Sequence, residues 1–290
     1  MPFVNDPGWG TSMTYRWKRI LGWVAFYAFI LFTWVPIFFV FYWMVATSLK
    51  TFLQNASIPP QFLPYVHFEP TLENWSLIFG ESQFWQTAWN SLVVAAGCTA
   101  LSLVVGIPCA FGVAKWGYKR LAASLLLLRI APGVVFLVPW FILFTKLHLV
   151  DTYPALILTH SIVSLPLATW LMIGFFEDLP PDLEEAARID GCSIYGHFWR
   201  IALPLVKPGI ITATILSFIA SWNNFLFSLI LAQNRTRTLP IILISYMSFE
   251  ATEWGKLAAA STLVTLPVIL LTLFVQRHIV KGLAVGAVKG

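Results

Sequence analysis

Residues 177–207 read EDLPPDLEEAARIDGCSIYGHFWRIALPLVK, a charged stretch between long apolar segments. Six of the 13 acidic residues lie between its first residue, Glu177, and Asp190. The segments on either side, 152–176 and 208–234, contain no Asp, Glu, Lys or Arg. A charged loop between two long apolar segments is typical of a protein that crosses a membrane more than once.

The order of residues in this loop predicts two short helices joined by a turn. Asp182 can cap a helix that begins after Pro181, because Asp side chains accept hydrogen bonds from the free amides at a helix start. Gly191 can end that helix, since glycine adopts the left-handed conformation without strain. Ser193 can cap a second helix, which is expected to end before Pro204. We therefore expect a helix–turn–helix that lies outside the bilayer.

The composition of the whole chain places it in a membrane. Of its 290 residues, 58% are hydrophobic and 11% are charged, which is more apolar surface than one soluble core can bury. A helix crosses a bilayer with about 20 apolar residues, because each adds roughly 1.5 Å to a span of about 30 Å. The segments that meet this length are 20–46, 86–114, 121–145, 152–176, 208–234 and 257–276. The sequence predicts an all-α membrane protein with six transmembrane helices and argues against a soluble enzyme.

The positions of Lys and Arg predict the orientation of these helices. Short cytoplasmic loops of membrane proteins carry an excess of Lys and Arg. With the N-terminus inside, 12 of the 18 basic residues are cytoplasmic, five are outside, and Arg129 lies within a span. Both termini and the charged loop are then cytoplasmic. The predicted parts are a cytoplasmic tail 1–19, a first helix 20–46, an extracytoplasmic loop 47–85, a five-helix core 86–280 that includes the loop 177–207, and a cytoplasmic tail 281–290.

Acidic and catalytic residues are missing from the predicted spans. All 13 Asp and Glu lie in tails, loops or span edges, whereas ion-driven carriers usually hold a carboxylate at membrane depth. The chain has no GxxxxGK(S/T) phosphate loop, and its five histidines are scattered singly, as expected for loop or interface residues. Its three cysteines form no CxxC pair, so no metal site or disulfide is expected. If the chain transports a solute uphill, another subunit must supply the energy.

The charged loop resembles a motif of the membrane subunits of ABC importers. The family pattern EAA-x3-G-x9-I-x-LP is matched at every fixed position by Glu185-Ala186-Ala187, Gly191, Ile201 and Leu203-Pro204. In that family the loop carries a coupling helix that fits a cleft in a cytoplasmic ATPase. The resemblance implies a type I ABC importer permease fold. It assigns ATPase coupling to Glu184, Glu185, Ala186, Ala187, Asp190, Gly191, Ile201, Leu203 and Pro204.

The resemblance covers roughly residues 86–290 and is closest to the carbohydrate-uptake branch of the family. The C-terminal residues are similar to the end of the second permease of maltose-type importers, whose tail reaches between the two ATPases. This similarity implies a docking role for Gly286 and Lys289. A frayed, solvated tail is the alternative, since chain ends are often poorly ordered.

The resemblance also implies a function and a set of partners. The chain would be a non-catalytic permease subunit in the bacterial cytoplasmic (inner) membrane, forming half of the pathway for a sugar, polyol or related small hydroxylated solute. It would pair with a second homologous permease, two ATPase subunits that bind ATP and Mg, and an extracytoplasmic solute-binding protein. The chain itself would lie in the lipid bilayer and bind no cofactor, metal or nucleic acid. The alternative is a subunit of an ion-coupled secondary transporter.

Polar residues inside the predicted spans are candidates for the solute pathway. Trp222, Asn223 and Asn224 put two adjacent amides into the otherwise apolar fifth span. These amides can hydrogen-bond between helices or contact the hydroxyl groups of a solute. Arg129 in the third span either faces a cavity or extends its side chain toward the inner face.

Overall fold

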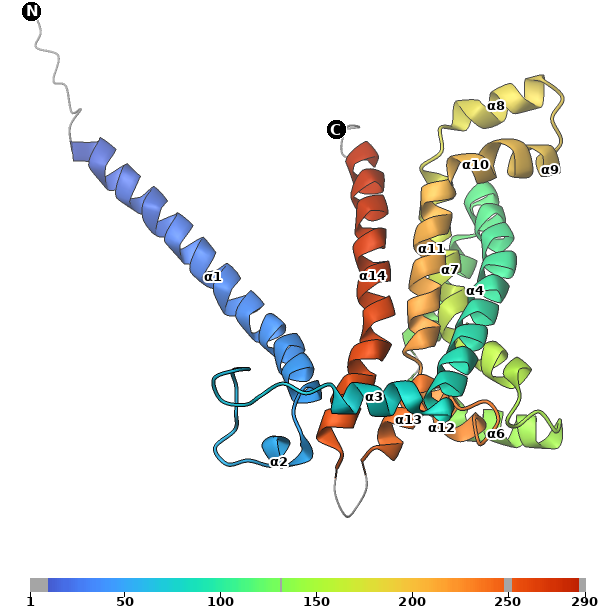
Figure 1. Cartoon of the computed structure of the whole chain (residues 1–290). Helices are drawn as coiled ribbons and strands as arrows, with labels where there is room; N and C mark the ends of the chain where they lie inside the picture. Colours follow the sequence, from blue (N-terminus) through green and yellow to red (C-terminus); the bar gives the residue numbers. More distant parts are fainter. Residues whose placement is uncertain (1–9, 131, 248–251, 287–290) are drawn as a thin grey trace, which may run out of the picture.

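Helices are the regular secondary structure in the part of the chain that the structure describes. A computed structural model describes residues 10–130, 132–247 and 252–286. Within these ranges helices and loops alternate, with two isolated β-bridges and no strand, which confirms the predicted all-α class. Figure 1 shows long helices running between two ends of the molecule, with short helices gathered at both ends.

Among the described residues, four helices are long and apolar enough to cross a membrane. They are α1 (Gly10–Ser48), α4 (Ser82–Trp116), α7 (Tyr153–Glu177) and α14 (Trp254–Gly286). Each contains an internal proline, at Pro36, Pro108, Pro166 and Pro267. Membrane helices tolerate such positions because neighbouring groups satisfy the carbonyls that proline leaves free. These helices correspond to the first, second, fourth and sixth predicted spans.

The fifth predicted span, 208–234, is interrupted in the structure. Helix α11 (Lys207–Trp222) ends well before residue 234, and α12 (Leu226–Leu231) follows after a break. At about 1.5 Å per residue, α11 is roughly 24 Å long, which is shorter than a hydrocarbon core of about 30 Å. The helical segment Ile194–Leu205 precedes α11 at an angle of 75°, and only together does this bent pair meet the length of a span.

The third predicted span, 121–145, is not one helix either. It is divided into α5 (Lys119–Ile130), a 3-10 turn η1 (Gly133–Phe136) and α6 (Leu137–Lys146). Pro132 lies at the break with φ −58° and ψ 126°, and its missing N–H cannot continue the hydrogen bonds of a helix. In the described part, four of the six predicted spans are therefore long helices, and the third and fifth predicted spans are interrupted.

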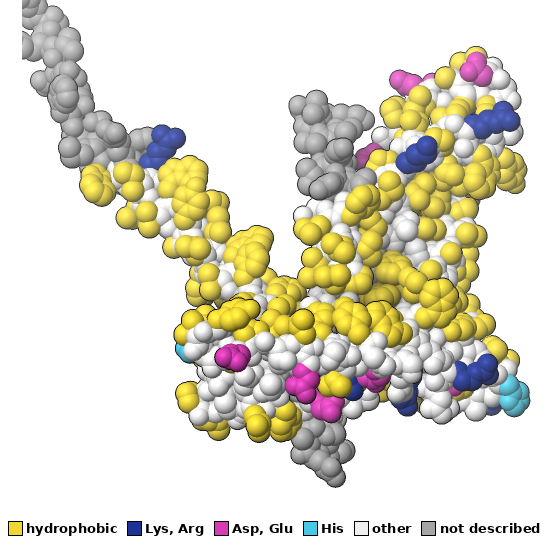
Figure 2. Space-filling model, viewed as in Figure 1, with side chains coloured by type: hydrophobic (Ala, Val, Ile, Leu, Met, Phe, Trp, Pro, Cys, Tyr) yellow, Lys and Arg dark blue, Asp and Glu magenta, His cyan; other side chains and the backbone are white. Residues whose placement is uncertain are grey.

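Helices α4, α7 and α11 pack against one another beside α14 (Figure 1). Phe111 of α4, Met172 of α7 and Ala213 of α11 are buried in one cluster near the charged loop. Helix α1 contacts α14 but leaves most of its apolar side chains exposed. Figure 2 shows hydrophobic side chains over the middle of the molecule and charged side chains gathered toward its two ends. This distribution fits a bilayer around the middle.

The end of the molecule opposite the charged loop is built from short helices, which include α2 (Phe52–Asn55), α3 (Glu73–Gly80) and α13 (Leu239–Ser245). Lys50 is 1% exposed there, and its Nζ donates to the carbonyl oxygen of Gln61 at 2.5 Å. The ammonium group also lies over the rings of Trp43 and Phe68. Burial lowers the pKa of Lys50. Through these contacts Lys50 holds the segment after α1 against the end of that helix.

Candidate functional site

The charged loop forms two helical arms joined by a turn (Figure 1). The first arm, α8 (Pro181–Ile189), begins after Pro180, and no side chain caps it. The prediction that Asp182 caps this helix is therefore wrong. Because proline has a preset φ and no N–H, it starts the helix one residue earlier, and Asp182 and Glu184 lie in the first turn, where the helix dipole favours acidic groups. The turn comes at Gly191, which has a φ of 71°, as predicted.

The second arm runs back to α11. The Ser193 hydroxyl accepts a hydrogen bond from the Gly196 N–H at 3.2 Å, which confirms the predicted cap. The arm continues through α9 (Ile194–His197), a π-helical turn (Phe198–Ala202) and α10 (Leu203–Leu205). It therefore runs past Pro204 instead of ending before it. Pro204 lies at the start of α10, and the bend into α11 comes two residues later, at Val206.

The motif residues of the first arm face two ways. Glu185, Ala186, Asp190 and Gly191 are exposed to solvent. Ala187 is 4% exposed and packs inward. The two alanines of the motif therefore have different surroundings: Ala186 belongs to an open surface, and Ala187 is buried.

The second arm adds exposed apolar surface beside the turn. Ile201 and Leu203 are half-buried, and Pro204 is exposed. Ile189 and Tyr195, on either side of Gly191, are 86% and 77% exposed. The sequence motif does not include these two side chains, and their exposure became visible only once the faces of the helices were known. Together with Glu185 and Ala186 they form a larger exposed surface.

One ion pair joins α8 to α4. Lys115 Nζ lies 2.6 Å from Glu184 Oε1, and Arg188, one turn further along α8, approaches the same oxygen at 3.1 Å. The hydrogen bond from Lys115 lowers the pKa of Glu184, so the carboxylate is charged at neutral pH. From the sequence, Lys115 is only one of the basic residues that predict the orientation of the spans. Nothing in its local sequence indicates a partner 69 residues away. The structure adds Lys115 to the candidate site.

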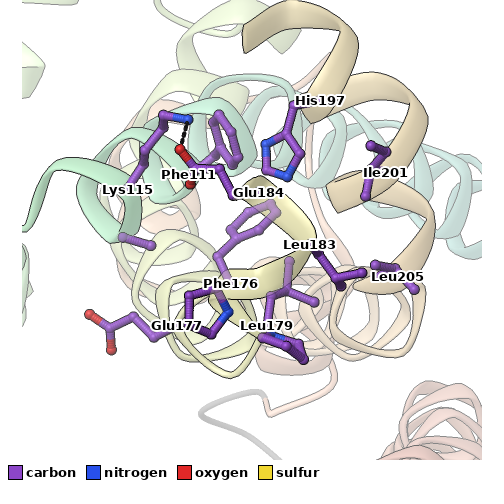
Figure 3. Close-up of a pocket in the computed structure, with 13 residues that line it drawn as sticks. Phe111, Lys115, Phe176, Glu177, Leu179, Leu183, Glu184, His197, Ile201 and Leu205 are labelled. Carbon is purple, nitrogen blue, oxygen red and sulfur yellow. Dashed lines mark hydrogen bonds and ion pairs between the residues drawn. The ribbon is translucent and has the colours of Figure 1, made fainter. Parts of the chain in front are cut away.

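A pocket of about 290 Å³ lies between α8 and the ends of α4 and α7 (Figure 3). Its lining is largely apolar and includes Phe111 and Leu183, with Lys115 and Glu184 beside them. His197 also faces the pocket, is 8% exposed, and has no hydrogen-bond partner at Nδ1 within the described structure. The pocket separates α8 from the ends of the membrane helices, so α8 does not pack flat against them.

The candidate pathway residues of the fifth predicted span lie where α11 breaks before α12: Trp222 is the last residue of α11, and Asn223 and Asn224 follow it. Trp222 is 7% exposed, and its Nε1 donates to the carbonyl oxygen of Val264 in α14 at 3.1 Å. Asn223 is the exposed residue that follows α11, and Asn224 Oδ1 accepts from the Phe227 N–H at 3.3 Å. Asn side chains compete for backbone hydrogen bonds, which favours a break at this point.

A buried histidine connects α7 to the same break. His160 is 1% exposed, with Nδ1 2.8 Å from the Ser221 hydroxyl and Nε2 3.2 Å from the Ser228 hydroxyl. Ser221 lies at the end of α11, and Ser228 lies in α12. The prediction that the single histidines are loop or interface residues is wrong for His160. Both of its partners lie more than 60 residues away, so no sequence pattern marks them.

Three predicted site residues can be placed only in part. Arg129 lies in the last turn of α5, and its side chain is outside the described part of the structure. Gly286 is the last described residue of α14, and Lys289 lies outside the described residues. Across the ranges that are described, no group of three or more His, Cys, Asp or Glu is placed to hold a metal ion.

At the opposite end of the molecule, one carboxylate holds the loop that follows α12. Asp151 accepts hydrogen bonds from the backbone N–H groups of residues 233–236 at 3.0 to 3.2 Å and from the Thr236 hydroxyl at 2.8 Å. Burial acts to raise the pKa of Asp151, but the hydrogen bonds outweigh it and the pKa is lowered. A charged carboxylate that accepts this many amide hydrogen bonds fixes the shape of the loop.

Helix α4 holds the same loop from a second side. Asn90 Nδ2 donates to the carbonyl oxygens of Arg235 and Arg237 at 3.0 and 2.9 Å. The Ser91 hydroxyl accepts from the Leu239 N–H at 2.7 Å. We call this arrangement of Asp151, Asn90 and Ser91 around residues 233–239 the Asp151 clasp.

Comparison with known proteins gives a consistent result. Residues 102–285 match the family described as binding-protein-dependent transport system inner membrane component. The chain is 38% identical to the probable ABC transporter permease protein y4oR of Sinorhizobium fredii, over 96% of this chain and 99% of the relative. It is 35% identical to the sulfoquinovosyl glycerol transport system permease protein SmoH of Agrobacterium fabrum, over 86% of this chain and 87% of the relative.

A solved structure supports the fold independently. One chain of a bacterial ABC transporter involved in the import of the acidic polysaccharide alginate superposes with a TM-score of 0.73 at 18% identity. The alignment covers 96% of this chain and 99% of that chain. The likeness at this level of identity concerns the arrangement of the helices.

Proposed function

This chain belongs to the family of binding-protein-dependent transport system inner membrane components, and we propose that it is a permease subunit of an ATP-driven importer for a sugar, polyol or related small hydroxylated solute. The observation that carries this proposal is the open surface at the tip of α8. Glu185, Ala186 and Gly191 are exposed there, on an arm that stands off from the apolar middle of the molecule.

We propose that an ATPase subunit binds this surface. The small side chain of Ala186 lets a partner approach closely, and Glu185 offers a carboxylate to a basic group. Ile189 and Tyr195 supply the apolar area that the core of an interface needs. The proposed coupling set is Glu184, Glu185, Ala186, Ala187, Asp190, Gly191, Ile201, Leu203 and Pro204. Its exposed members are proposed to contact the partner, and its buried and half-buried members, among them Glu184 with its ion pair to Lys115, to hold the loop in shape.

The proposed topology has six crossings with both termini in the cytoplasm. The interrupted segments around α5–α6 and α11–α12 form the third and fifth crossings, because irregular backbone is tolerated at membrane depth where protein surrounds it. In support, the start of α1, the end of α14 and helix α8 all lie at one end of the molecule (Figure 1). The proposed parts are the tail 1–19, the first helix 20–46, the extracytoplasmic loop 47–85, the core 86–280 and the tail 281–290.

The proposed assembly contains a second homologous permease, two ATPase subunits that bind ATP and Mg, and an extracytoplasmic solute-binding protein. Gly286 and Lys289 are proposed to dock between the ATPases. Asn223, exposed at the break after α11, is the proposed contact with solute, and Trp222 and Asn224 hold that break in place. The name of one relative, which refers to sulfoquinovosyl glycerol, supports the class of solute.

The proposed mechanism is alternating access. When the ATPases close on ATP they displace α8, and the spans change from an inward-facing to an outward-facing arrangement. ATP can drive this change only if the closed ATPases bind the outward-facing state more tightly than the inward-facing one. The arms of the loop therefore have to transmit displacement, not merely bind the partner.

Two exposed alanines test the docking surface. Ala186→Arg puts a long charged side chain on the proposed interface, and we expect it to abolish co-purification of the ATPases from detergent-solubilised membranes. Ala56→Arg makes the same change at an exposed position at the other end of the molecule and should leave co-purification intact. Equal recovery of the ATPases with both variants would contradict the proposed function of α8.

A further inference from the structure

Helix α8 is held away from the membrane helices along most of its length. The pocket beneath it separates α8 from the ends of α4 and α7 (Figure 3). Its covalent links run through residues 178–180 to α7 and through residues 190–193 to the second arm. A displacement of the α8 tip would therefore reach α7 and α11 through the chain, but no covalent link carries it to α4.

The Lys115–Glu184 ion pair links α8 directly to α4. Within the described ranges it is the one side-chain hydrogen bond or ion pair that connects α8 to a membrane helix. The dashed contact in Figure 3 crosses the edge of the pocket from α4 to α8. The Lys115 side chain is 10% exposed and that of Glu184 is 32% exposed, so water screens this pair less than a pair on the open surface.

The position of Lys115 suits a rigid connection. It lies in the last turn of α4, where the helix dipole favours a positive charge, and Gly117 in the left-handed conformation ends the helix directly afterwards. Its Nζ also lies 5.7 Å from the centre of the Phe111 ring, one turn earlier on α4. Phe111 in turn belongs to the cluster that joins α4, α7 and α11. The lysine is thus attached to the packed cluster of α4, α7 and α11.

We propose that Lys115 is a positioning residue that transmits the displacement of α8 directly to α4, through its ion pair with Glu184. This inference rests on the proposed function of α8 and adds a second route by which that displacement reaches the spans. Arg188 shares the Glu184 oxygen, but its side chain is 72% exposed and belongs to α8 itself, so it cannot carry displacement to another helix.

The test uses the full complex in vesicles, with solute uptake and ATP hydrolysis measured in parallel. Lys115→Met and Glu184→Gln each remove one charge. We expect both variants to insert and to retain the ATPases. Losing one charge-assisted hydrogen bond changes an equilibrium constant by up to about tenfold. We therefore expect the amount of solute imported per ATP to fall by about threefold to tenfold. Arg188→Ala is the matched control on the same carboxylate and should leave the ratio unchanged.

A charge exchange separates transmission from mere packing. Lys115→Glu and Glu184→Lys should each lower the ratio of uptake to ATP hydrolysis, and the double exchange should restore at least half of it. If Lys115→Met does not assemble, Glu184→Gln and the double exchange decide the question. An unchanged ratio in the single variants, no recovery in the double exchange, or loss of assembly in every variant would overturn the proposal. Because Ala186→Arg tests docking separately, failure of this link leaves the docking result standing.

Discussion

The two ends of this molecule are built in opposite ways. At one end α8 projects over a pocket and is joined to the membrane helices by the Lys115–Glu184 ion pair. At the other end the Asp151 clasp holds residues 233–239 with hydrogen bonds from two separate elements. A segment with few attachments can move as a unit, whereas a segment held from several sides stays fixed. The contrast indicates a mobile coupling end and a fixed end for the loop after α12.

The same contrast appears in how the two turns are made. Gly191 ends α8 with a φ of 71°, and a Cβ placed there would meet nothing within 4 Å. Asp151 also has a positive φ, of 61°, but its side chain is fully engaged by the neighbouring loop. In the first case the backbone alone sets the turn, and in the second a network of hydrogen bonds does.

The largest expected effect is at the coupling end. Gly191→Val forces a β-branched residue into the left-handed conformation, which costs about 1–2 kcal/mol or changes the turn. We expect solute uptake to fall to background while membrane insertion and ATP hydrolysis persist. Gly174→Val in α7 is the control, because its Cβ also meets nothing within 4 Å and its backbone conformation is helical. Coupled uptake at the normal rate in the Gly191 variant would count against the role of this turn.

The fixed end should respond in stability more than in coupling. Asp151→Ala leaves the amides of residues 233–236 without their acceptor, and we expect a loss of about 2 kcal/mol of stability together with fast hydrogen exchange at those amides. Asp178→Ala, at an exposed position, is the comparison and should change neither. Hydrogen exchange read by mass spectrometry measures the effect directly. Slow exchange in the Asp151 variant would show that the clasp does not fix this loop.

A smaller effect separates the two amides at the break after α11. Asn224→Ala removes the acceptor for the Phe227 N–H, and we expect a loss of about 1 kcal/mol of stability, seen as a lower Tm. Asn223→Ala should leave the Tm unchanged and alter the uptake rate or the range of solutes. If Asn223→Ala lowers only the Tm, its side chain serves packing and does not line the pathway.

The smallest effect is the dependence on pH. The pKa of Asp151 is lowered, so the stability that the clasp contributes is complete above the ordinary value of 3.8 and is lost as the pH falls through the lowered pKa. The pKa of Glu184 is likewise lowered from its ordinary value of 4.5, so the stability that its ion pair contributes is complete above that value and is lost as the pH falls through the lowered pKa. The difference in Tm between the wild-type protein and Asp151→Asn should stay constant from pH 8 to pH 5 and shrink only in stronger acid. A difference that disappears near pH 6 would contradict this assignment.

Local signals in the sequence predicted local structure well. The turn at Gly191 and the cap at Ser193 follow from the conformational freedom of glycine and from the hydroxyl of serine, and both are present. The start of α8 was misplaced because Pro180 and Pro181 outweigh Asp182 as a helix start. The interruptions at Pro132 and Asn223 were missed because hydropathy alone does not distinguish a continuous helix from a broken one.

Contacts between distant segments could not be predicted from a single sequence. Lys115 and Glu184 carry no local mark of their pairing, and neither do His160 and its two serines. Their partners are fixed only when α4, α7 and α11 pack together. For this reason the motif identified the exposed coupling surface, while the ion pair that attaches this surface to the membrane helices emerged only from the structure.

The most direct test of the central claim is solute uptake into vesicles that contain the reconstituted complex, measured with ATP supplied or withheld on the cytoplasmic side. The solute-binding protein and its solute are placed on the opposite side. Proton and sodium gradients are abolished in one set of vesicles and imposed without ATP in a second set. The proposed function predicts uptake that requires ATP and disappears without it. Uptake that proceeds without ATP and follows an imposed ion gradient would contradict the account.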